Sequence, residues 1–131
     1  GLFEQFRTTT GFQGRKQIFM NIYEELETHA NVEETIVYPA FRNYPEFKEL
    51  LDRSYKDHDT VKQELRSLLD QLERGEARID IDDFTNRVNR LADSVNKHVT
   101  EEESELFPLV RQHLRRPERE RMGRHIQAAK D

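Results

Sequence analysis

The sequence contains no cysteine among its 131 residues. Disulfide bonds and thiolate ligands are therefore excluded, and any bound metal must be held by nitrogen and oxygen atoms. No apolar run approaches the roughly 20 residues that cross a bilayer, and the first residues lack the regions of a signal peptide. These absences lead us to expect a cytoplasmic protein that does not insert into a membrane. Gly1 is not an initiator residue, so we expect the sequence to be trimmed from a longer chain.

Positive charge is in the minority: 21 lysines and arginines stand against 26 aspartates and glutamates, with a formal net charge of −5. Proteins that bind nucleic acid through their surface usually carry clustered positive charge. We therefore expect a small-molecule partner and no nucleic acid. Arginines recur near the end of the chain, but Glu118 and Glu120 interrupt them, as in an amphipathic helix exposed to solvent. The length predicts one domain, residues 1–131, with one core.

Helical spacing of apolar residues dominates the sequence, which has only five glycines and few alternating β-branched runs. After an unusually short first helix, a second is predicted over about residues 15–42. A third begins near Pro45 and ends before Gly75, and a fourth begins at residues 80–83, whose aspartates suit a helix N-terminus. Pro117 opens a short terminal helix. The sequence thus predicts an all-α, antiparallel up-down four-helix bundle with a truncated first helix and a short C-terminal extra helix.

Two segments, residues 29–39 and 98–108, share one pattern: a histidine, a glutamate four residues later, and an aromatic–proline pair at the end. A helix brings residues four apart onto one face, so each segment presents an imidazole beside a carboxylate, a pairing that suits a transition metal. Each proline should bend or end its helix after that pair. The two pairs are His29 with Glu33 and His98 with Glu102.

Three histidines replace apolar residues in the inward stripes of the predicted helices: His29, His58 and His98. We expect all three to point inward, where the middles of antiparallel helices meet at a common level. Burying two carboxylates without partners is costly, and a bound cation is the simplest compensation. A hydrogen-bonded core histidine or a surface glutamate explains any one of these residues alone, but the combination predicts a metal site. Its predicted ligands are His29, Glu33, His58, His98 and Glu102.

The order of these residues resembles the hemerythrin family, specifically its HHE cation-binding type, over essentially the whole chain. The resemblance is carried by Leu2 to Phe6, His29 with Glu33, the Asp57-His58 step, and His98 with Glu102 through Phe107-Pro108. It implies a left-handed antiparallel bundle that encloses two non-haem iron ions with an oxo or hydroxo bridge. The two glutamates would bridge the irons. His29 would serve one iron, and His58 and His98 mainly the other.

Two positions depart from the pattern of the family. A further first-helix histidine would fall before Gly1, so the resemblance implies that iron occupancy can be partial. Oxygen-carrying members also have a second histidine in the third helix, where this sequence has Lys62, and a protonated lysine cannot coordinate. Water, Glu34, Tyr23 or Tyr55 could fill a vacant position.

The resemblance implies a non-haem di-iron protein that binds or senses dioxygen, peroxide, nitric oxide or iron, because missing ligands disfavour efficient oxygen transport. Two alternatives stay open. An enzyme that consumes peroxide or oxidises ferrous iron would use the same residues, and loss of the metal would leave a helical interaction module. We favour a non-enzymatic protein that binds metal and oxygen.

Overall fold

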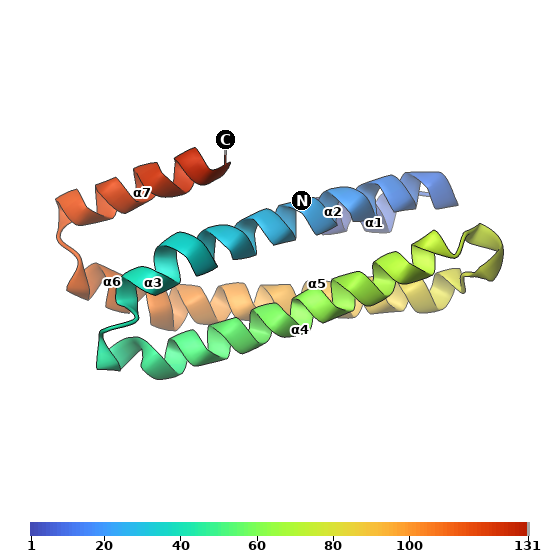
Figure 1. Cartoon of the computed structure of the whole chain (residues 1–131). Helices are drawn as coiled ribbons and strands as arrows, with labels where there is room; N and C mark the ends of the chain where they lie inside the picture. The colour runs from blue at the N-terminus through green and yellow to red at the C-terminus, as the bar shows by residue number, and fades with distance from the viewer. Residues whose placement is uncertain (131) are drawn as a thin grey trace. The chain divides into compact units, whose positions relative to one another are not determined.

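The computed structural model describes residues 1–130, apart from the side chains of residues 126, 129 and 130. Its elements are helical and no strand occurs within residues 1–130, which confirms the predicted all-α helical bundle. Figure 1 gives the helix labels used below. In the described part of the chain, no helix combines the length and the apolar character that a bilayer crossing requires.

Contacts between residues divide the chain into two compact units, each with its own hydrophobic core. Unit 1 comprises residues 1–27 and 59–96, and unit 2 comprises residues 28–58 together with residue 97 onward. The prediction of one domain over residues 1–131 stays a prediction.

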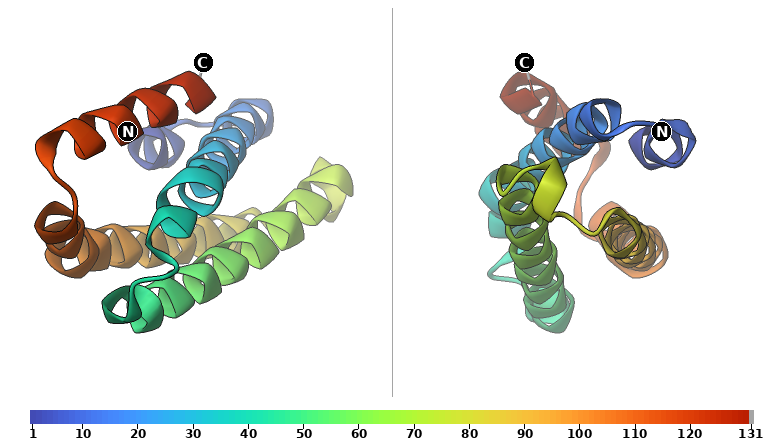
Figure 2. Two further views of the ribbon diagram at one scale, coloured as in Figure 1. Left: turned by 60° about the vertical axis from the view of Figure 1, so that its left-hand side comes forward. Right: turned by 90° about the vertical axis from the view of Figure 1, so that its right-hand side faces the viewer.

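Unit 1 is built from four helical segments. They are α1 (Leu2–Thr8), the first part of α2 (Phe12–Val32), the later part of α4 (Lys48–Glu73) and the first part of α5 (Ile81–Glu101). α1 lies alongside the first part of α2 (Figure 2). Apolar side chains at helical spacing line the inward faces of these segments and form the core. The core residues are Phe6, Phe19, Ile22, Leu65, Leu68, Leu72, Phe84, Val88 and Leu91.

The helix ends in unit 1 follow local sequence signals. Gly11 before α2 and Gly75 after α4 have φ angles of 84° and 94°, in the left-handed region that a glycine adopts without strain. The short turn η3 (Glu76–Arg78) follows Gly75. Asp80 Oδ1 then accepts hydrogen bonds from the backbone N–H groups of Asp82 and Asp83, each at 3.1 Å. This N-cap confirms the predicted start of the fourth helix.

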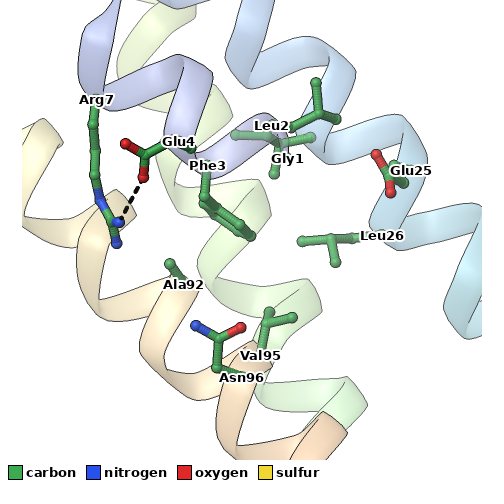
Figure 3. Close-up of a pocket in the computed structure, with 11 residues that line it drawn as sticks. Gly1, Leu2, Phe3, Glu4, Arg7, Glu25, Leu26, Ala92, Val95 and Asn96 are labelled. Atoms are coloured by element: carbon green, nitrogen blue, oxygen red, sulfur yellow. Dashed lines mark hydrogen bonds and ion pairs between the residues drawn. The ribbon is translucent and has the colours of Figure 1, made fainter.

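Unit 1 also holds a cavity of about 350 Å³, lined by residues of α1, α2 and α5 (Figure 3). The side chains of Phe3, Leu26 and Val95 face it, and an ion pair of 3.4 Å between Arg7 and Glu4 lies at its edge. None of the predicted metal ligands lines this cavity.

Unit 2 contains the shorter helical elements and two π-helical turns. In chain order these are η1 (Glu33–Val37), α3 (Tyr38–Phe41), η2 (Pro45–Phe47), η4 (Glu102–Leu106), α6 (Phe107–His113) and α7 (Arg116–Lys130), with the adjoining ends of α2, α4 and α5. α7 folds back against η1 (Figure 1). The core of unit 2 is formed by Tyr38, Phe41, Phe47, Leu51 and Leu106.

Each π-helical turn begins at a glutamate that the sequence predicts as a metal ligand. The N–H of Tyr38 donates to the carbonyl of Glu33, and the N–H of Phe107 donates to the carbonyl of Glu102. The next residue in each segment is a proline, Pro39 or Pro108. In a regular α-helix its ring would clash with the carbonyl four residues earlier, and its nitrogen has no hydrogen to donate. The wider turn avoids this clash, so each proline widens its helix instead of ending it at the site.

Candidate metal centre

Four of the five predicted ligands come together in unit 2 and are buried, with exposed fractions of 5% to 9%. One ligand atom from each residue lies within 4.8 Å of those of the others. Opposite ligands of a first-row metal ion are about 4.2 Å apart, which is twice a bond length of about 2.1 Å. The group therefore has the size that one ion requires. Its members are Glu33, His58, His98 and Glu102.

The two imidazoles of the group face one another through their Nε2 atoms, which are 3.2 Å apart. His98 Nδ1 lies 3.1 Å from Asp57 Oδ2, an acceptor that keeps a proton on Nδ1 and directs Nε2 into the group. His58 Nδ1 is buried without a hydrogen bond, and Glu34 Oε1 lies 3.6 Å from it. Two ring nitrogens at this distance cannot both carry a proton, so one donates to the other in the metal-free protein, and a cation bound by both would replace this hydrogen bond.

The electrostatics of the group are governed by its two buried carboxylates. Burial lowers the pKa of His98, but the ion pair with Glu102 and the hydrogen bond to Asp57 outweigh burial and raise this pKa to about 9. Burial raises the pKa of Glu33, but hydrogen bonds from the neighbouring histidines, Glu102 and Tyr38 hold it well below its usual range. Burial and the nearby Glu33 raise the pKa of Glu102. The metal-free group therefore holds protons that a metal ion would displace.

His29 lies at the edge of this group and not within it. Its side chain is 56% exposed, so the prediction that it points inward is wrong. The neighbouring residue Ala30, which is 8% exposed, lies on the inward face of α2 instead of His29. His29 Nε2 is nevertheless 3.0 Å from Glu33 Oε1, so the imidazole approaches the carboxylate from the solvent side.

Tyr38 is absent from the predicted ligands, yet its phenol lies among them. Its hydroxyl donates to Glu33 Oε2 at 2.8 Å and lies 3.2 Å from His58 Nε2 and 3.3 Å from Glu102 Oε1. Five residues of a regular α-helix would rotate Tyr38 by about 140° from Glu33, so helical spacing does not predict this contact. The π-helical turn brings the two residues together, and the Tyr-Pro pair was its only signal in the sequence. Burial and the charges of the two glutamates raise the pKa of Tyr38.

The two repeated segments differ at this aromatic position. Tyr38 is fully buried, whereas Phe107 is 38% exposed and the preceding Leu106 is buried in its place. Of the two tyrosines suggested as substitute ligands, Tyr55 packs its ring against Tyr38 with centroids 5.1 Å apart. Tyr23 belongs to unit 1, where it interacts with Glu27 and Arg66.

The fold and the site define an all-α helical protein with a buried group of glutamates and histidines that suits a metal ion. The chain belongs to the hemerythrin family, because residues 1–110 match the family described as Hemerythrin HHE cation binding domain. This range includes every predicted ligand and Tyr38, whereas α7 lies beyond it.

Two relatives are similar to most of the chain. A protein of Nostoc sp. (strain PCC 7120) named DNA nickase is 31% identical over 132 residues, which cover 98% of this chain and 35% of that protein. An uncharacterized hemerythrin-like protein of Schizosaccharomyces pombe is 29% identical over 108 residues, which cover 81% of this chain and 50% of that protein. The chain thus spans between a third and a half of these relatives. No solved structure shows a significant match.

Proposed function

We propose that this chain is a non-haem di-iron protein that binds or senses dioxygen, peroxide, nitric oxide or iron. The observation that supports this proposal best is the facing pair of imidazole nitrogens, 3.2 Å apart, beside two buried carboxylates. Imidazole and carboxylate ligands together suit iron and other first-row metals. Membership of the hemerythrin family supports the same proposal.

The predicted ligands would divide between two ions. His58, His98 and Glu102 would hold one ion and His29 the second, with Glu33 next to both sets of ligands. When bound, the iron ions would supply electrons and an open coordination position for a small oxidant. Asp57 keeps a proton on His98 Nδ1 and thereby leaves Nε2 for the metal. Because the side chain of His29 is 56% exposed, the second position would exchange its metal more readily.

The proposal includes a small-molecule partner, no nucleic acid and no membrane, with the protein in the cytoplasm. The formal charge of −5 supports the absence of nucleic acid. Glutamates of α7 also pair with two arginines at its start: Arg115, which precedes the helix, with Glu118, and Arg116 with Glu120, both at 3.1 Å.

Elemental analysis tests the proposal directly. We expect up to two iron ions per chain in the purified protein, and a large loss of iron in His58→Ala and His98→Ala. His125→Ala, which changes an exposed histidine of α7, is the matched control and should retain the iron. Exposure of the reduced protein to dioxygen should also produce a near-ultraviolet band that the two site variants lack. A folded parent protein without iron would disprove the proposal. Steady consumption of peroxide over many cycles would instead identify an enzyme.

A second candidate function follows from the similarity to the protein named DNA nickase. Under this alternative the metal centre would activate a water molecule for phosphodiester cleavage. Conversion of supercoiled plasmid to open circles by the metal-loaded protein, and loss of that activity in His98→Ala, would support it. The acidic charge of −5 and coverage of only 35% of the relative make it the weaker candidate.

A further inference from the structure

We propose that Tyr38 binds the metal of this centre through its phenolate oxygen. This inference rests on the proposed function and adds a ligand to it. The hydroxyl oxygen lies 2.8 Å, 3.2 Å and 3.3 Å from ligand atoms of Glu33, His58 and Glu102 respectively. Ligands at right angles on one ion are about 3.0 Å apart, which is √2 times a bond length of about 2.1 Å. The distances from the phenol oxygen to three of the four buried residues are therefore close to the distance between neighbouring ligands of one metal ion.

The side chain of Tyr38 is held in this position by its own packing. It is fully buried, with its ring against Tyr55 at 5.1 Å and against His58 at 5.5 Å between centroids. The π-helical turn after Glu33 places it on the face of the ligands. The second repeat has Phe107 at the equivalent position, which has no oxygen and is 38% exposed. The centre thus has one phenol, on one side.

Coordination requires the phenol to lose its proton, and the structure contains a route for that proton. On metal binding the Tyr38 O–H bond would break, the oxygen lone pair would bind the ion, and the proton would pass to Glu33 Oε2, its acceptor at 2.8 Å. The other oxygen of Glu33 lies 3.0 Å from Nε2 of His29, whose side chain is 56% exposed, so the proton can reach solvent. Each metal ion bound by Tyr38 should therefore release one proton from the phenol, with no change in the number of electrons.

A phenolate ligand would change the chemistry of the bound iron. A phenolate is a hard, anionic oxygen ligand and stabilises ferric iron relative to ferrous iron. The resting centre would therefore be oxidised, which suits a sensor or a slow oxidase better than a reversible oxygen carrier.

Optical and Raman spectra of the protein loaded with Fe³⁺ test this ligand. We expect a visible phenolate-to-iron charge-transfer band, with resonance Raman ring modes that shift when the tyrosines are deuterated. Tyr38→Phe should lose the band, keep most of the iron by elemental analysis, and release one proton fewer per chain on loading. Tyr55→Phe removes the hydroxyl of the adjacent ring and is the matched control that should retain the band. Phe107→Tyr adds a phenol to the second repeat and should add no band.

The outcomes separate this inference from the proposed function. Iron bound without a tyrosinate band, or a band that persists in Tyr38→Phe, would overturn the inference and leave the di-iron proposal intact. A folded parent protein that binds no iron would overturn both. If Tyr38→Phe does not fold, the band should survive in Tyr23→Phe, Tyr44→Phe and Tyr55→Phe, which assigns it to Tyr38 by elimination. Its loss in one of these three variants would disprove the assignment.

Discussion

The metal-free protein should lose stability as the pH rises from 6.5 to 9. The ion pair with Glu102 and the hydrogen bond to Asp57 raise the pKa of His98 from its ordinary value of 6.5 to about 9 in the folded protein. Protonated His98 therefore stabilises the fold. This contribution is fully present below pH 6.5 and is lost as the pH rises through about 9. The difference of about 2.5 pKa units corresponds to about 3 kcal/mol, at about 1.36 kcal/mol per unit.

The titratable groups next to His98 do not reverse the fall in stability with rising pH. Burial raises the pKa of Glu102, so ionisation of Glu102 costs free energy in the folded protein and this cost also lowers stability as the pH rises. Glu33 has a lowered pKa, and its stabilisation is lost only under acidic conditions, as the pH falls through its folded pKa. The His98 side chain is 11% exposed, so solvent screening reduces the estimate of about 3 kcal/mol only modestly.

Urea unfolding followed by circular dichroism, with a chelator present, measures the effect at pH 6, 7, 8 and 9. The free energy of unfolding of the parent protein should decline by about 3 kcal/mol over this range. In His98→Gln most of the decline should disappear, and His125→Gln, with its change at an exposed position, should behave as the parent does. Equal stability of the parent at pH 6.5 and 9, or an undiminished decline in His98→Gln, would refute the reasoning.

Four further substitutions test other features of the molecule. Asp57→Asn weakens the acceptor of the His98 Nδ1 proton and should reduce metal affinity about 10- to 100-fold in a competition titration with a chelator; unchanged affinity would show that this contact is not needed. Gly75→Ala should lower the free energy of unfolding by about 1 kcal/mol, because its φ of 94° disfavours a side chain. Gly123→Ala, in the open surface of α7, should instead raise it by up to about 1 kcal/mol in the same unfolding assay. Phe19→Ala removes a fully buried ring whose centroid lies 5.6 Å from that of the Phe84 ring. Calorimetry should show that the free energy of unfolding falls by about 3–5 kcal/mol.

Local sequence by itself determined the helices and the pairing of each histidine with its glutamate. Asp80 marks the start of α5 because its carboxylate accepts N–H groups two and three residues later, whatever packs around it. A spacing of four places His98 beside Glu102 on any α-helix, and the structure shows this ion pair. The prolines also marked where each helix is disturbed. These features depend on residues within one or two turns of one another, so the sequence contains enough information to predict them.

Tertiary structure decided which side chains share the centre. The exposure of His29 depends on the rotation of α2 about its axis, and one residue of difference exchanges His29 for Ala30 on the inward face. The contact between His58 and His98 joins residues 40 positions apart in the chain, and no local spacing predicts its distance of 3.2 Å. Tyr38 reaches the ligands because the turn after Glu33 is wider than an α-helical turn. That width is set by the following proline together with the packing of the fully buried ring, and the packing exists only in the folded chain.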